Sequence, residues 1–283
     1  MLGSGTMGQG IAQVAAQGGH PTFMYDAAPG RAAEAVAAIG TQLEKLVAKG
    51  KMSSEAKDRA LAGLRAAGDV ASACEGAEIV IEAAPENMEL KVDLFQKVVL
   101  VTSGQTLLGS NTSSLSITEL GARIGAPERT IGLHFFNPPP VMELLEIVRG
   151  LRTSEASVER ALKFARLVGK TPIIVRDTPG FATSRLGVVL GAEAIRMLES
   201  GVASTADIDR AMELGYRHPM GPLKLTDLVG LDVRLSILDH LHKEVGEQFR
   251  APSLLRTMVR AGKLGKKTGE GFYRWRDGIP FAE

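Results

Sequence analysis

A histidine and a glutamate flank a proline-rich segment in the stretch GLHFFNPPPVMELLEIV (132–148). The segment NPPPVM cannot continue a strand because proline lacks the ladder N–H donor. If the flanking runs form adjacent antiparallel strands, a connection centred on Pro140 places His134 opposite Glu146. A carboxylate beside an imidazole holds its tautomer and stabilises the imidazolium, so this pair is a candidate general base for a hydroxyl proton. The alternative is a histidine that is only hydrogen-bonded within the core.

A glycine-rich turn near the start of the chain is a candidate dinucleotide site. GSGTMG (3–8) fits the pattern G-x-G-x-x-G, in which Gly3 permits a tight turn, Gly5 lets the backbone approach a pyrophosphate and Gly8 lets the next helix pack closely. That helix presents free N–H groups to phosphate, and its first residues are Thr6 and Met7. The alternative is a glycine turn that binds no ligand.

Asp26 strengthens the dinucleotide interpretation. It ends the predicted strand PTFMYD (21–26), about 20 residues after the turn, where a carboxylate can accept bonds from both ribose hydroxyls. The same carboxylate repels a 2′-phosphate, so NAD is favoured over NADP. Arg31 is the counter-indication, because a nearby arginine can accommodate that phosphate, although on a helix it is more often solvated.

Polar residues follow two further predicted strands. SNTSSLSI (110–117) opens a helix, and its hydroxyls are helix caps by default. Because ligands of open α/β sheets bind at the carboxyl ends of strands, Ser113 or Asn111 is also a candidate to bond a substrate oxygen. Glu86 and Lys91 are candidates to line the nicotinamide side of the cleft, with a solvated helix face as the alternative for each.

The organisation of the chain predicts an α/β protein with a Rossmann-type, doubly wound sheet, since apolar runs alternate with helical patterns. Strands are expected at 21–26, 78–84, 106–110, 130–135, 143–148 and 171–176. After DTPG (177–180) no strand pattern follows; Ser204 caps a run through Leu214, and two amphipathic helices follow within 221–261. We therefore predict an NAD-binding domain over 1–177 and an all-helical domain over 178–283.

The first strand of this fold is largely missing, because only Met1 and Leu2 precede the glycine turn. Its loss is expected to remove ladder bonds and to leave apolar neighbours exposed. We expect the native chain to start upstream of Met1.

Composition limits the classes of function. The 33 basic and 32 acidic residues give a formal charge of +1, which argues against a general nucleic-acid binder. No apolar run reaches the roughly 18 residues of a membrane span. The single Cys74 cannot form an internal disulfide, which suits the cytoplasm. The histidines outside 132–148 have no partners at metal-ligand spacing, so no metal is expected; they are His20, His218, His240 and His242.

Several blocks together resemble the short-chain L-3-hydroxyacyl-CoA dehydrogenases, including bacterial 3-hydroxybutyryl-CoA dehydrogenases. They occur in family order along almost the whole chain, and they are GSGTMGQGIAQ, VIEAAPENMELK, SNTSSLSIT, GLHFFNPPPVMELLEIV, DTPGFATSRL, HPMGPLKLTDLVGLD and GKKTGEGFY. The resemblance implies NAD as cofactor, an acyl-CoA substrate, and a helical second domain that forms most of a homodimer interface.

The resemblance also assigns roles to individual residues. His134 matches the catalytic histidine, Glu146 its carboxylate partner, and Ser113 the serine that bonds the substrate's 3-oxygen. Asp26 matches the ribose-binding acid. The residues that match the lining of the cofactor cleft are Glu86, Lys91 and Asn137, and the stretch that lies where the family meets the CoA phosphates holds Lys45, Lys49 and Lys51.

One departure from the family pattern concerns the substrate. Ser184 stands where the family has an asparagine that helps to hold the substrate. Serine keeps a donor and an acceptor but is shorter, so a water has to complete the contact.

The function expected is oxidation of a 3-hydroxyacyl-CoA by NAD. Two rivals are a dehydrogenase of a free hydroxy acid or sugar acid, and a catalytically silent NAD-binding relative.

Overall fold

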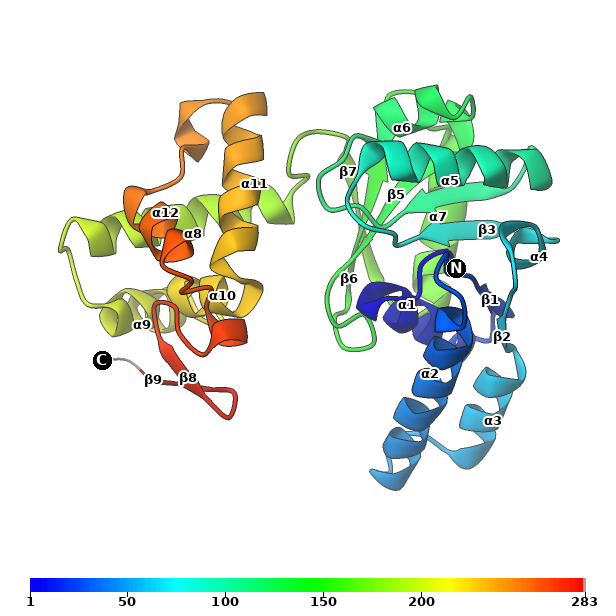
Figure 1. Ribbon diagram of the computed structural model, residues 1–283, viewed down its shortest axis with the longest axis horizontal. Helices are drawn as coiled ribbons and strands as arrows, with labels where there is room; N and C mark the ends of the chain where they lie inside the picture. The colour runs from blue at the N-terminus through cyan, green and yellow to red at the C-terminus, as the bar shows by residue number, and fades with distance from the viewer. Residues whose placement is uncertain (282–283) are drawn as a thin grey trace. The chain divides into compact units, whose positions relative to one another are not determined.

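The computed structural model describes residues 1–281, which form two compact units, Met1–Thr178 and a second unit from Pro179 onward (Figure 1). The break lies within DTPG, after the last strand of the first unit has ended at Arg176.

The first unit is built on a largely parallel sheet. Five strands lie in the order β3-β4-β5-β6-β7, and β1 and β2 form a separate parallel pair. Neighbours are parallel except β5 and β6, which are antiparallel. The strands are β1 (Thr22–Met24), β2 (Leu64–Ala66), β3 (Ile79–Glu82), β4 (Leu107–Ser110), β5 (Thr130–Phe135), β6 (Leu144–Arg149) and β7 (Thr171–Arg176). All six predicted strands are present, and β2 was missed because its three residues carry no alternation.

Residues 1–3 pair with β3 on one side and with Tyr25, next to β1, on the other. Leu2 N–H donates to Ile81 O and Gly3 N–H to Tyr25 O, both at 2.8 Å, and Leu2 is fully buried. Residues 1–3 therefore make ladder bonds that the sequence predicted to be lost. Phe23, on β1, is 41% exposed and borders a groove of about 510 Å³.

Helices cover both faces of the sheet, as a doubly wound fold requires. On one face Ile11 and Phe164 pack against Leu133, and on the other Phe95 packs against Leu108. The helices of this unit are α1 (Thr6–Gln17), α2 (Arg31–Ala48), α3 (Ser54–Ala62), α4 (Val70–Cys74), α5 (Met88–Val101), α6 (Ile117–Arg123) and α7 (Glu155–Leu167). α2 and α3 pack against each other and on α1, beside the β1–β2 pair (Figure 1).

The antiparallel pair β5–β6 has the register that the sequence predicts. His134 faces Glu146, and Gly132 faces Val148. A Cβ on Gly132 would lie 2.6 Å from the Val148 side chain, so the pair packs closely there. The proline segment between the strands forms their connection.

The second unit is mainly helical. It contains α8 (Thr183–Glu199), α9 (Thr205–Gly215), α10 (Pro222–Val229), α11 (Leu231–Glu244) and α12 (Ser253–Arg260). Ser204 caps α9 as predicted. The prediction of two helices within 221–261 was wrong, because Gly230, at a positive φ of 106°, separates α10 from α11 and α12 follows them.

The expectation that no strand follows residue 180 was also wrong. β8 (Arg274–Arg276) and β9 (Ile279–Phe281) form a small antiparallel pair. The turn between them uses Asp277 and Gly278, both at positive φ, which is the signature of a tight hairpin.

Within residues 1–281, no helix has both the length and the apolar character needed to cross a bilayer. Among the same residues, no group of three or more His, Cys, Asp or Glu side chains is placed to bind a metal ion.

Candidate active site

His134 and Glu146 form a buried pair on adjacent strands. Nδ1 of His134 lies 2.7 Å from Oε2 of Glu146, and the side chains are 9% and 0% exposed. The ring of Phe136 lies against the imidazole, with centroids 4.5 Å apart. Glu146 therefore occupies the Nδ1 side of the ring, and Nε2 is on the opposite side.

Ser113 lies in a loop that is held by hydrogen bonds to the carboxylate of Glu86. Oε1 of Glu86 accepts hydrogen bonds from Thr112 Oγ1 at 2.6 Å, from Ser113 N–H at 2.9 Å and from the Ser113 hydroxyl at 3.3 Å. Ser114 adds bonds from its N–H at 3.2 Å and its hydroxyl at 3.1 Å. Burial opposes ionisation of Glu86, but the bond from Thr112 and the charge of Lys91 outweigh it and lower the pKa of this carboxyl. Glu86 thus stays anionic and fixes the serine loop.

Lys91 is buried rather than open to the surface of the cleft. Its Nζ lies 2.5 Å from Glu82 Oε1 and 3.5 Å from Glu86 Oε2, and its side chain is 1% exposed. Ser110 donates to the other oxygen of Glu82 at 2.6 Å. Glu82 was missed by the sequence analysis, although a carboxylate at the end of an apolar strand was a signal for such a buried pair.

The glycine turn has the shape of a dinucleotide cradle. A Cβ on Gly3 would meet Ala83 O at 2.6 Å and one on Gly8 would meet Gly3 O at 2.0 Å, whereas a Cβ on Gly5 would meet nothing within 4 Å. Gly5 is the N-cap of α1 and no side chain caps the helix, so the first N–H groups, those of Thr6 and Met7, have no side-chain partner. The open space at Gly5 and these donors fit a pyrophosphate.

Asp26 follows β1 and points back to this turn. Oδ2 accepts from Ser4 N–H at 2.8 Å and from the Ser4 hydroxyl at 2.7 Å, and Oδ1 accepts from Ala28 N–H at 3.0 Å. Burial opposes ionisation, but these bonds prevail and lower the pKa of the carboxyl. Ser4 therefore orients the Asp26 carboxylate at the place where the ribose of NAD would lie. Ser4 was not among the residues predicted from the sequence. The residues fit NAD.

Two asparagines lie at the end of β5. Oδ1 of Asn111 accepts from Phe135 N–H at 2.9 Å, which ties β4 to the end of β5. Asn137 is exposed and begins the proline connection with a cis bond to Pro138. The buried Lys170 holds that connection by donating to Pro139 O at 2.6 Å and Met142 O at 2.8 Å.

Asp177 anchors the chain as it leaves the first unit. Its Oδ2 accepts from Ser116 Oγ at 2.8 Å and from Thr118 N–H at 2.7 Å, at the start of α6. Ser184 belongs to the second unit, in the first turn of α8, where it is half-buried.

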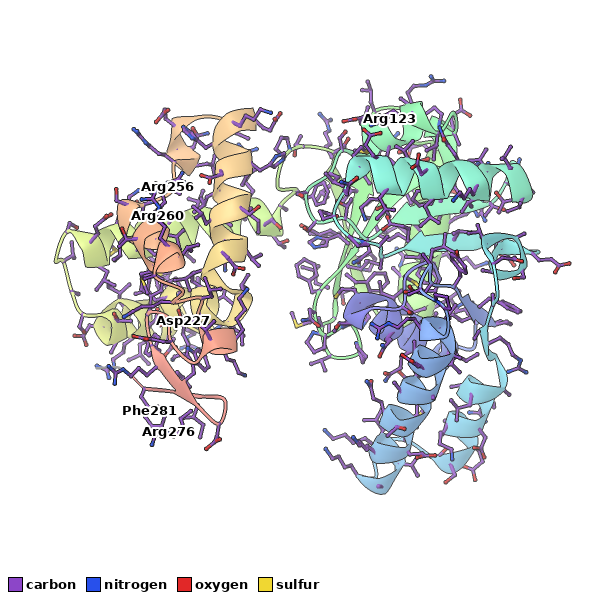
Figure 2. The ribbon with its side chains drawn as sticks, in the orientation of Figure 1. Arg123, Asp227, Arg256, Arg260, Arg276 and Phe281 are labelled. Carbon is purple, nitrogen blue, oxygen red and sulfur yellow. The ribbon has the colours of Figure 1, made fainter. Side chains whose placement is uncertain are left out.

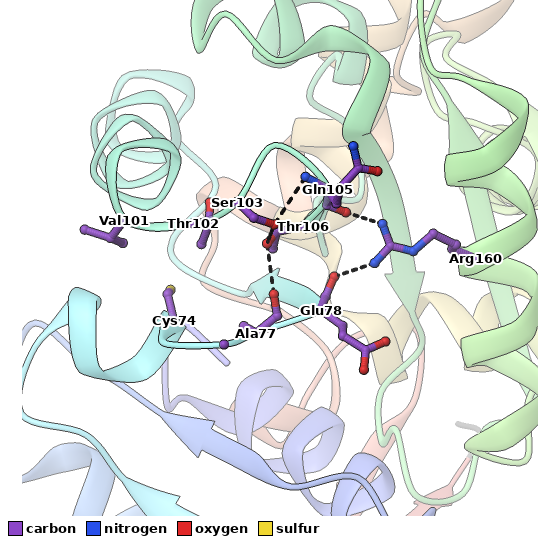
Figure 3. Close-up of a pocket in the computed structure, with 10 residues that line it drawn as sticks. Cys74, Ala77, Glu78, Val101, Thr102, Ser103, Gln105, Thr106 and Arg160 are labelled. Carbon is purple, nitrogen blue, oxygen red and sulfur yellow. Dashed lines mark hydrogen bonds between the residues drawn. The ribbon is translucent and has the colours of Figure 1, made fainter.

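A separate small pocket of about 260 Å³ holds none of these residues (Figure 3). The pocket lies beside Cys74, between the segments that precede β3 and β4. In its wall Arg160 donates a hydrogen bond to Glu78 O at 2.8 Å, and the Thr106 hydroxyl donates to Ala77 O at 2.9 Å. Because ligands of open α/β sheets bind at the opposite, carboxyl ends of the strands, this pocket is not the candidate site.

A nucleotide cradle on a doubly wound sheet, with a buried imidazole–carboxylate pair, defines the class of dinucleotide-dependent dehydrogenases. The chain matches two family models, described as the NAD binding domain (residues 1–178) and the C-terminal domain (residues 180–275) of 3-hydroxyacyl-CoA dehydrogenase. It belongs to the 3-hydroxyacyl-CoA dehydrogenase family.

Relatives match along nearly the whole chain. A probable 3-hydroxybutyryl-CoA dehydrogenase of Bacillus subtilis is 43% identical, over 98% of this chain and 96% of that protein. A 3-hydroxyadipyl-CoA dehydrogenase of Escherichia coli is 43% identical over 98% of this chain, which spans 58% of that longer protein. The crystal structure of an (S)-3-hydroxybutyryl-CoA dehydrogenase from Ralstonia eutropha superposes with a TM-score of 0.94, at 39% identity and 98% coverage of both chains.

Proposed function

We propose that this protein oxidises the 3-hydroxyl of an (S)-3-hydroxyacyl-CoA of short chain to the 3-oxo group, reversibly, with His134 as the general base. The observation that carries the proposal is the buried contact of 2.7 Å between His134 Nδ1 and Glu146 Oε2. A base so paired takes a proton at Nε2, and the carboxylate stabilises the imidazolium that forms.

Ser113 is proposed to bond the same substrate oxygen. In the structure its hydroxyl donates to Glu86 at 3.3 Å, a long bond, and a hydroxyl rotates freely enough to turn its proton toward a ligand. The backbone N–H of Ser113 stays with Glu86, so the loop keeps its position while the hydroxyl changes partner. Glu86 is therefore proposed to position Ser113, and Lys91 to hold Glu86.

NAD held at the glycine turn would supply the acceptor for the hydride of the substrate carbon. The N–H groups at the start of α1 and the open approach at Gly5 support its pyrophosphate, and Asp26 supports its ribose. The charge of Asp26 opposes a 2′-phosphate, so NAD is favoured over NADP.

The second unit is proposed to hold the acyl group through Ser184 and to form the contact between two copies of the chain. Several large apolar side chains of this unit are exposed, among them Leu186 at 73%, Leu214 at 75% and Tyr216 at 76%. Exposed apolar area of this kind supports an association surface.

The test is a steady-state comparison of 3-hydroxybutyryl-CoA and free 3-hydroxybutyrate, each with NAD and with NADP. We expect turnover of the thioester with NAD and weak turnover of the free acid. Preference for the free acid would favour a dehydrogenase without CoA. NAD binding with no turnover of either compound would favour a catalytically silent relative.

A further inference from the structure

Arg234, on α11, is a buried cation without a partner. The residue is 7% exposed and its Nε is buried without a hydrogen bond; across residues 1–281 no protein group forms a hydrogen bond or ion pair with the guanidinium. Burial lowers its pKa to about 10, so it is still charged at neutral pH. Arginine is almost never buried unless it is paired, because an uncompensated buried charge is costly.

Three carboxylates of the second unit are engaged by groups other than Arg234. Asp209 accepts from Tyr273 OH at 2.7 Å and from two N–H groups at the start of α10. Asp227 accepts from two backbone N–H groups and from an indole N–H at 2.8–2.9 Å. Asp232, two residues before Arg234, pairs with Lys267 at 2.6 Å. None of these three carboxylates therefore neutralises the charge of Arg234.

The guanidinium lies against α8, close to Ser184. A Cβ on Gly187 would lie 3.2 Å from Arg234 Nη1, so the absence of a side chain there lets the guanidinium approach the helix. Ser184 is three positions before Gly187, and residues three apart share one helix face at a spacing of about 5–6 Å. The cation thus lies about one helical turn from the residue proposed to contact the substrate.

We infer that Arg234 recognises a carboxylate at the far end of a longer acyl chain. Besides short 3-hydroxyacyl-CoAs, the protein then accepts 3-hydroxyacyl-CoAs whose acyl group is a dicarboxylic acid, and it prefers them to monocarboxylic acyl groups of equal length. The inference rests on the proposed function and on Ser184 contacting the acyl group. The planar guanidinium binds a carboxylate through two parallel N–H donors. A methyl end at the same place leaves the charge unpaired, and a site built for a polar group rejects a substrate that lacks it.

The test compares two substrates of equal length, 3-hydroxyadipyl-CoA and 3-hydroxyhexanoyl-CoA, by the ratio of their kcat/KM values with NAD. We expect wild type to favour the dicarboxylic substrate, and Arg234→Met to lower the ratio by about 10-fold to 100-fold, as loss of a charge-assisted bond predicts. Arg234→Lys, which keeps the charge but not the two-pronged geometry, should give an intermediate ratio. Arg260→Met removes an exposed arginine of the same unit and should keep the wild-type ratio (Figure 2).

Each outcome decides a different point. No turnover of either thioester by wild type would refute the proposed function. Turnover of both, with a ratio near one that Arg234→Met does not move, would overturn the inference alone. The same unmoved ratio with a dimer that dissociates in Arg234→Met would also overturn it, by assigning the guanidinium to a second copy of the chain.

A binding measurement on wild type covers the case in which Arg234→Met fails to fold. Adipyl-CoA and hexanoyl-CoA lack the 3-hydroxyl, so they inhibit without reacting. We expect adipyl-CoA to inhibit about 10-fold more strongly. Equal inhibition would overturn the inference.

Discussion

Glu146→Gln separates the charge of the carboxylate from its shape. The glutamine still places an oxygen beside Nδ1 of His134, 2.7 Å away in the wild type, so the ring keeps an acceptor. What is lost is the attraction between a carboxylate and the imidazolium that forms once His134 has taken the proton. Because that attraction arises in the charged state, the loss falls on kcat more than on KM.

The size of the effect follows from burial. Both side chains are at most 9% exposed, so solvent screens the pair weakly. A hydrogen bond between charged groups contributes about 1.5–3 kcal/mol, and about 1.36 kcal/mol changes a rate tenfold, so kcat should fall roughly 10- to 150-fold.

The assay is NAD reduction with 3-hydroxybutyryl-CoA, with Glu143→Gln as the matched control. Glu143 is exposed just before the same strand, and its replacement should leave kcat within about twofold of wild type, as for surface changes in general. A folded Glu146→Gln protein with undiminished kcat would refute the idea that the carboxylate stabilises the transition state.

Three further predictions concern the elements around this pair. Glu86→Gln should destabilise the first unit at neutral pH by about 1 kcal/mol, a low value because the side chain is 37% exposed. Since the folded pKa of Glu86 is lowered, this advantage of wild type is present above its unfolded pKa and is lost as pH falls through the folded value. Urea titrations at neutral and acid pH check this, with the exposed Glu44→Gln as control. A pH-independent difference would contradict it. Gly8→Ala should lower the melting temperature because its Cβ would lie 2.0 Å from a backbone oxygen. Gly5→Ala should fold normally and weaken NAD binding, measured by calorimetry, about tenfold or more. The reverse pattern would refute the proposal that this glycine turn binds the pyrophosphate. Leu2→Ala should cost about 2–5 kcal/mol in a denaturant titration because Leu2 is fully buried, and a loss below about 1 kcal/mol would show that residues 1–3 do not act as a sheet strand.

The sheet could be predicted because its strands are apolar runs bounded by turn residues. The facing of His134 and Glu146 could be predicted too, since the proline connection fixes the register. α8 was not predicted, because a run of small and β-branched residues such as GVVLGA has weak helical preference and is held as a helix by tertiary packing.

The parts of the site that escaped prediction are long-range side-chain contacts. Glu86 reaches residues 26 to 28 positions away, and Ser4 reaches Asp26 across 22 positions. No local pattern encodes such contacts. Residue type and position after a strand predicted that Glu86 and Lys91 line the cofactor cleft, but only the structure reveals that the Lys91 side chain is buried against Glu82.

The most direct test of the central claim is turnover by His134→Gln, measured beside its affinity for NAD. The glutamine fills a similar space but cannot take a proton at neutral pH. We predict that turnover of 3-hydroxybutyryl-CoA falls by about 10²-fold or more while NAD binds as in wild type. A folded His134→Gln protein that turns over at the wild-type rate would contradict the assignment of His134 as the base.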